Sequence, residues 1–158
     1  MRIFEEKQAF RQWWLFALLG TSTLVILAPI IKSTNEDSIW SITIPIFLLA
    51  IIILGFLVLR LHTRIDSTGI YAKFDPLNLA NKKFSWDEIK SCYVRKYSPL
   101  TEYGGWGIRG FPKAKAYNVS GNMGIQLVTK AGKKFLIGTN KPEQAQKVID
   151  RYRDKIKI

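Results

Sequence analysis

The chain has 158 residues, enough for one ordinary domain or for a small domain with an additional segment, and it carries a net charge of +12. Its single cysteine and single histidine exclude an internal disulfide and the usual zinc sites, which need several such ligands. Because the apolar residues are concentrated in the first third of the chain, the sequence favours a small domain with an additional segment.

Two apolar segments dominate the N-terminal part. Residues 12–31 contain no charged side chain, and neither do residues 38–59. Each has about the 20 residues that a helix needs to cross a bilayer. A pair of buried helices in a soluble protein is the less favoured alternative, because only Pro45 and Gly55 interrupt the apolar surface of the second segment. We therefore expect a transmembrane hairpin with spans at about 12–31 and 39–61.

The basic residues beside these segments predict the orientation of the hairpin. The connector Lys32–Asp37 holds one basic residue, whereas several lie outside the two segments. These are Arg2, Lys7, Arg11, Arg60 and Arg64. Since basic residues are retained on the cytoplasmic side, we expect a multi-pass protein of the inner (cytoplasmic) membrane with both termini in the cytoplasm. Residues 1–62 would form the N-terminal tail and hairpin, and residues 63–158 a cytoplasmic domain.

The charge of the chain is concentrated in its C-terminal part. Residues 62–158 contain 19 lysines and arginines against 8 acidic residues, a net charge of +11. A basic domain held at a membrane is attracted to anionic lipid headgroups by about 1 kcal/mol for each basic side chain near the surface. Nucleic acid would be attracted by the same charge, but tethering favours the bilayer. The expected partners are the lipid bilayer, anionic headgroups or a membrane protein, and not nucleic acid.

The C-terminal part reads as short strands followed by one helix. The turn at 66–69 predicts a first hairpin with Ile70–Phe74 as its second strand, and Lys130-Ala131-Gly132 predicts a hairpin that joins 124–129 to 133–137. Further predicted elements are one helical turn around 86–88 and strands at 90–97 and 117–119. Asn140 and Glu143 have capping-box spacing. The final helix is predicted by an apolar stripe at Ala145, Val148, Ile149, Tyr152 and Ile156.

Two stretches of this part carry a family resemblance. "FSWDEI" and "GNMGIQLVTKAGKKFLIGTNKPEQAQKVI", together with the order of elements, resemble bacterial pleckstrin-homology-like (PH-like) domains over residues 63–157, and the two apolar segments resemble the membrane-anchored, uncharacterised members of that group. The resemblance implies an α+β fold, a curved antiparallel sheet or barrel capped by a C-terminal helix, and no catalytic activity. The turn 66–69 lacks the lysines and arginines that PH domains use for inositol phosphates, so that recognition is not carried over.

A glycine motif raises the possibility of nucleotide binding. Gly105-Trp-Gly107-Ile-Arg-Gly110 matches G-x-G-x-x-G, but Phe111-Pro112 follows at once and no helix pattern begins there. A dinucleotide-binding loop must open a helix and needs an acidic residue about 20 positions further on, and residues 116–139 contain none. We therefore predict a loop or distorted hairpin in which glycines take positive φ angles, and no cofactor.

The same glycine-rich stretch holds the candidate contact residues. In one interpretation Trp106 plugs the end of a barrel and Arg109 pairs with Glu102 or Asp87. In the other, exposed aromatic and basic side chains contact headgroups or a partner protein. The candidates for such contacts are Tyr103, Trp106, Arg109, Phe111, Lys113 and Lys115.

The sequence predicts a binding protein and not an enzyme. His62 is the single histidine available as a general base, and it lies at the end of the second apolar segment, where an interfacial polar residue is expected. Cys92 lies in an alternating apolar stretch and is predicted to be a small core residue. We expect a non-enzymatic, membrane-anchored adaptor without metal or cofactor. The alternative is a small transmembrane subunit that associates through its helices with a transporter or other complex, or with copies of itself as a homo-oligomer.

Overall fold

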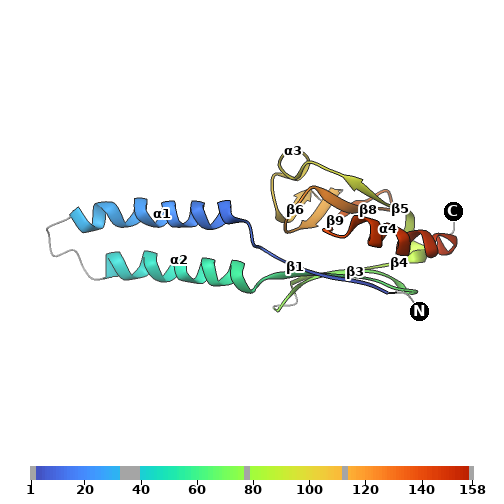
Figure 1. The fold of residues 1–158 in the computed structure, drawn as a ribbon, viewed down its shortest axis with the longest axis horizontal. Coiled ribbons are helices and arrows are strands. Elements are labelled where there is room, and N and C mark those ends of the chain that lie inside the picture. The colour runs from blue at the N-terminus through green and yellow to red at the C-terminus, as the bar shows by residue number, and fades with distance from the viewer. Residues whose placement is uncertain (1–2, 33–39, 77–78, 112–113, 157–158) are drawn as a thin grey trace. The chain divides into compact units, whose positions relative to one another are not determined.

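The computed structural model describes residues 3–32, 40–76, 79–111 and 114–156. The chain divides into two compact units. Phe10–Val58 forms a helical unit, and the residues up to Ala9 combine with those from Leu59 onward in a sheet unit. The helical unit is thus an insertion between the first and second strands of the sheet unit (Figure 1).

The helical unit consists of α1 (Trp13–Lys32) and α2 (Trp40–Val58), which run side by side in opposite directions (Figure 1). At the start of the unit, Phe10 packs edge-to-face on Phe56, with ring centres 5.3 Å apart. The hydroxyl of Thr23 donates a hydrogen bond of 2.7 Å to a carbonyl of the preceding turn of α1, so a polar side chain is satisfied within the helix. Many of the described apolar side chains of the unit are exposed, among them Trp13.

The predicted transmembrane hairpin is wrong. Within the residues that the structure describes, no helix is long and apolar enough to cross a membrane. The second predicted span, 39–61, is not a single helix, because α2 ends at Val58 and Arg60 already begins a strand that buries Leu61 completely. The predicted multi-pass location in the inner membrane is therefore wrong as well. The transmembrane-subunit alternative depended on the same hairpin, which the described residues do not form. Most of the connector used for the orientation, residues 33–37, lies outside the described residues.

The first sheet has four antiparallel strands in the order β1-β2-β3-β4. Its strands are β1 (Phe4–Ala9), β2 (Arg60–Ile65), β3 (Gly69–Asp75) and β4 (Leu79–Ser85). The predicted turn at 66–69 joins β2 to β3, and Ile65 lies opposite Ile70 as the hairpin requires. The Asp66 side chain accepts hydrogen bonds from the backbone N–H groups of Thr68 and Gly69, which closes the turn.

The second sheet has five strands in the order β5-β8-β9-β7-β6. These are β5 (Ile89–Lys96), β6 (Gly107–Phe111), β7 (Ala114–Asn118), β8 (Met123–Thr129) and β9 (Lys134–Gly138). The predicted hairpin of β8 and β9 is confirmed, with Ile125 opposite Ile137. β7 pairs with the border of β9 that β8 leaves open, and it runs parallel to β9. The predicted fold class, a membrane protein with an antiparallel sheet or barrel, is therefore corrected to a mixed α/β fold with two sheets.

Short helices connect and cover the sheets. They are η1 (Trp86–Glu88), α3 (Pro99–Tyr103), α4 (Pro142–Arg151) and η2 (Arg153–Lys155). The apolar stripe predicted for the last helix is confirmed at four positions, since Ala145, Val148, Ile149 and Tyr152 are buried. The predicted capping box is wrong. Lys141 and not Asn140 precedes the helix, because the Asn140 side chain is bonded to Ser120 and its N–H to the Glu6 carboxyl group.

The core of the sheet unit lies between the two sheets. Phe74 of the four-stranded sheet meets Tyr117 of the five-stranded sheet with ring centres 5.7 Å apart, and Phe84 meets Phe135 at 4.9 Å. Aliphatic side chains fill the remaining space between them. The fully buried members include Leu61, Ile65, Ile70, Ile125, Leu127 and Ile137. Such burial is the main contribution to the stability of the unit, at about 25 cal/mol for each Å² of apolar surface.

Candidate functional site

The glycine-rich stretch forms a turn and the strand β6, and its glycines take the predicted positive φ angles. Gly104 ends α3 with φ +72°, and Gly105, Gly107 and Gly110 have φ of +123°, +112° and +99°. At Gly110 an added Cβ would lie 2.1 Å from the carbonyl oxygen of Ala114, so a side chain there would push the paired strand away. β6 (Gly107–Phe111) begins inside the motif and runs past its last glycine, where a nucleotide-binding loop would open a helix. The prediction that the motif does not open a helix is thereby confirmed.

A buried asparagine holds this stretch in place. Asn118 is fully buried at the end of β7, and its side-chain oxygen accepts a hydrogen bond of 2.9 Å from the N–H of Gly107. Its amide group donates to the hydroxyl of Tyr97 at 3.0 Å and to the carbonyl of Gly105 at 3.5 Å. One side chain therefore fixes the backbone on both sides of Trp106.

The candidate contact residues of this stretch do not converge on one cavity. Trp106 is half-buried and donates to the Gly121 carbonyl at 3.3 Å, while Arg109 is exposed and donates to the Trp106 carbonyl at 2.9 Å. Phe111 is 76% exposed. Tyr103 is half-buried against Tyr97. Lys113 lies outside the described residues, and Lys115 is exposed on β7 at a different site, the lysine pocket defined below.

Glu102, one of the two acidic partners considered for Arg109, pairs with a different arginine. The Glu102 carboxylate is held by Arg95, with 2.6 Å between Oε2 and Nη2, and it also accepts the N–H of Ser98 at 2.9 Å. The hydrogen bonds from Arg95 hold the pKa of Glu102 below its ordinary value. Arg95 belongs to β5, and nothing in the sequence indicated that it would pair with Glu102. The Arg109–Glu102 pair considered from the sequence is therefore not formed.

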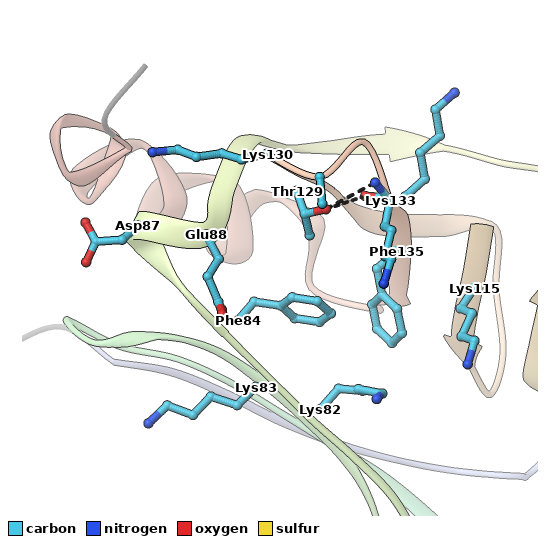
Figure 2. A pocket seen from close by; sticks show the side chains of 12 residues that line it. Lys82, Lys83, Phe84, Asp87, Glu88, Lys115, Thr129, Lys130, Lys133 and Phe135 are labelled. Carbon is cyan, nitrogen blue, oxygen red and sulfur yellow. Dashed lines mark hydrogen bonds between the residues drawn. The ribbon is translucent and has the colours of Figure 1, made fainter. Parts of the chain in front are cut away.

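A pocket of about 590 Å³ opens between the two sheets and is lined mainly by lysines (Figure 2). We call it the lysine pocket. β4 contributes two lysines, β7 one, and the β8–β9 turn with the start of β9 three. The six are Lys82, Lys83, Lys115, Lys130, Lys133 and Lys134. Phe84 and Phe135 lie between the two groups of lysines and face each other (Figure 2).

Backbone contacts position the β8–β9 turn at this pocket. The N–H and the hydroxyl of Thr129 both donate to the carbonyl of Lys133, at 2.9 and 3.3 Å, and the N–H of Lys133 donates back to the Thr129 hydroxyl at 3.1 Å. The N–H of Lys130 donates to the carbonyl of Glu88 at 2.9 Å, which ties the turn to η1. The turn that carries Lys130, Lys133 and Lys134 is therefore held by hydrogen bonds at both of its ends.

The pocket lysines lack acidic partners in the part of the chain that the structure describes. The ion pairs found there involve His62, Arg64, Lys73 and Arg95, and none includes a pocket lysine. Two acidic residues also line the pocket, but Glu88 is engaged with the Ser85 N–H at 3.1 Å, and the Asp87 carboxyl group points away from Lys82 and Lys133 (Figure 2). Lysines outnumber acidic residues six to two in the lining, so the pocket carries net positive charge that attracts anions.

The lysines of this pocket were not predicted to lie together, and Lys130 was expected only as part of a hairpin turn. Lys82 and Lys130 belong to different sheets and are 48 positions apart in the sequence, and the packing of the two sheets brings them to one pocket. The repeated Lys-Lys dipeptides were the available signal, but nothing in the sequence joined them to one cavity.

The groups suited to catalysis are engaged in structural contacts. His62 lies between Glu5, at 2.8 Å, and Asp75, at 3.4 Å, on the four-stranded sheet. It is thus paired on strand β2, and not an interfacial residue at the end of a span. No group of three or more potential metal ligands occurs within the described ranges.

No protein-family model matches the chain, and no curated protein matches its sequence.

Cys92 is half-buried on β5, and its reactivity tests the predicted place of the thiol in the core. Burial, reinforced by Asp150, raises the pKa of the Cys92 thiol far above its ordinary value, so the thiol stays neutral at physiological pH. We expect a thiol-specific reagent to modify the native chain at least about 100-fold more slowly than the chain in concentrated guanidinium chloride, since thiolate is the reactive form. A native rate close to the denatured rate would contradict the core assignment.

Proposed function

We propose that the chain is a non-catalytic adaptor whose sheet unit binds the phosphate of anionic headgroups in the lysine pocket. The observation that carries the proposal is a cavity lined by lysines of both sheets, none of which forms an ion pair among the described residues. The ammonium group of Lys83 lies 5.2 Å from the centre of the Tyr71 ring. Lysine binds phosphate as a point charge. A cavity of about 590 Å³ also falls in the size range of small-ligand sites.

The two phenylalanines refine the kind of ligand that fits. Phe84 and Phe135 give the pocket an apolar wall between its lysines. A ligand with a phosphate and a carbon skeleton, such as a phospholipid headgroup, can contact both surfaces, whereas a bare inorganic anion contacts the lysines alone. The resemblance of residues 63–157 to PH-like domains supports the proposal of a binding module in place of an enzyme.

The test measures binding of the full chain to vesicles. Phosphatidylcholine vesicles with and without phosphatidylglycerol are pelleted with the wild type and with the double variant Lys130→Ala/Lys133→Ala. We expect the wild type to prefer the anionic vesicles. The double variant should bind them about 30-fold more weakly, since each lysine near an anionic surface contributes about 1 kcal/mol.

A matched variant separates the pocket from general charge. Lys96 and Lys147 are exposed and lie outside the lysine pocket, so Lys96→Ala/Lys147→Ala removes the same charge elsewhere. We expect it to weaken binding by less than about threefold at moderate salt, because screening reduces the effect of distant charges. Equal losses in the two variants would refute the pocket as the site. Binding of pyrophosphate by the wild type without binding to either vesicle would assign the pocket to soluble phosphates.

A further inference from the structure

The outer strand of the five-stranded sheet, β6, has an open edge. Within the described residues β6 pairs with β7 on one side and has no strand on the other (Figure 1). At the opposite border of this sheet, the N–H of Val94 on β5 donates to the side chain of Gln146 from α4 at 2.8 Å. The border at β5 is thus covered in part by a helix, whereas the border at β6 is left for a further strand.

The side chains of β6 are exposed and mostly apolar. Ile108 is 48% exposed and Phe111 76%, and the exposed Arg109 lies between them. Successive residues of a strand point to opposite faces, so Arg109 and Phe111 share one face and Ile108 lies on the other. An exposed edge with apolar side chains is the usual site of strand addition, in which backbone hydrogen bonds give affinity and side chains give specificity.

A second copy of the chain does not suit this edge. Arg109 is the middle residue of the five in β6, so symmetric antiparallel pairing of two copies would place the two Arg109 side chains opposite each other. Like charges directly opposite each other destabilise a strand pair. An acidic residue opposite Arg109 would instead be attracted, and the strongly basic surroundings strengthen that preference.

From this charge complementarity we propose that β6 binds an extended segment of a partner protein by strand addition, with an acidic residue of the segment opposite Arg109 and apolar residues on either side. This surface is distinct from the lysine pocket. It gives the adaptor a protein-binding site in addition to its phosphate site.

The test measures the affinity of the full chain for labelled synthetic peptides. The chain is kept in non-ionic detergent, because α1 and α2 have exposed apolar side chains. One peptide has glutamate between two valines, and the other has lysine in its place. We expect the glutamate peptide to bind about tenfold more tightly, because an attractive cross-strand pair replaces a repulsive one. Arg109→Glu should reverse this preference, whereas Arg153→Glu, an exposed change in η2, should leave it unaltered.

A third peptide tests strand addition itself. It has the glutamate sequence but carries N-methyl groups on alternate amides, which removes the donors that pair with an edge strand. We expect its binding to be lost. The proposal would be overturned by equal affinity for the glutamate and lysine peptides, by unchanged binding of the methylated peptide, or by sedimentation of the chain as a dimer that Ile108→Glu dissociates. The lysine-pocket variant should bind the peptide as the wild type does, so the two proposals fail separately.

Discussion

Replacing Glu6 with alanine is expected to lower the free energy of unfolding of the sheet unit by about 3 kcal/mol, because two hydrogen bonds to one buried carboxyl group are lost. Glu6 is 4% exposed on the inner face of β1. Its oxygens accept the hydroxyl of Thr139 at 2.6 Å and the N–H of Asn140 at 2.9 Å. These bonds join the first strand of the chain to the segment between β9 and α4, more than 130 residues away.

The neighbouring glutamate provides the control. Glu5 points outward on the same strand and pairs with His62, and its side chain is 51% exposed. Glu5→Ala should cost less than about 1 kcal/mol, as exposed ion pairs do. Urea denaturation followed by tryptophan fluorescence gives both values. Similar losses in the two variants would show that β1 is not held through Glu6.

The strand that Glu6 stabilises was not predicted from the sequence, and the reason is physical. The inner face of β1 carries Phe4, Glu6 and Gln8, so the strand lacks the alternation of apolar and polar residues that marks a half-buried strand. The Glu6 carboxyl group and the amide N–H of Gln8 are bonded to distant groups, while the buried Gln8 side-chain oxygen has no hydrogen-bond partner among the described residues. Gln8, for example, donates to the carbonyl of Gly138 at 2.7 Å. Such partners are determined by tertiary packing and leave no local pattern.

Elements with a local signal were predicted well. The β8–β9 hairpin has alternating apolar residues and a glycine-containing turn, and the stripe of α4 follows helical spacing. The helical turn of η1 was also predicted, and in the structure Ser85 and Glu88 form a capping box there. The parallel pairing of β7 with β9 was not predicted, because it depends on which border of the β8–β9 hairpin remains open.

The second apolar segment was wrongly predicted to be one membrane span, because its length and hydropathy were considered without the structure at its C-terminal end. The segment counted as one span up to residue 61 is divided between α2 and β2, and Leu61 belongs to the core of the sheet unit. An apolar residue contributes equally to a predicted span and to a buried strand. Only the pairing of β2 with β1 and β3 distinguishes the two, and that pairing involves residues from both sides of the helical unit.

Asn118→Leu is expected to destabilise the sheet unit by about 2–3 kcal/mol, because polar groups of the glycine-rich stretch lose a buried partner. The N–H of Gly107 would lose its acceptor, and the hydroxyl of Tyr97 would lose its donor. Leucine is close in volume to asparagine, so the loss reflects the missing hydrogen bonds more than a cavity. Asn122→Leu, at an exposed position in the turn after β7, should cost less than about 0.5 kcal/mol.

A second measurement connects this residue to the proposed peptide site. If Asn118 orders β6, its loss should speed tryptic cleavage after Arg109 under native conditions, because proteases cut locally unfolded segments. The same loss should weaken binding of the glutamate peptide, since strand addition needs β6 to be preformed. Destabilisation without faster cleavage after Arg109 would separate the two roles: Asn118 would then support the core around Tyr97, and the order of β6 would come from its pairing with β7.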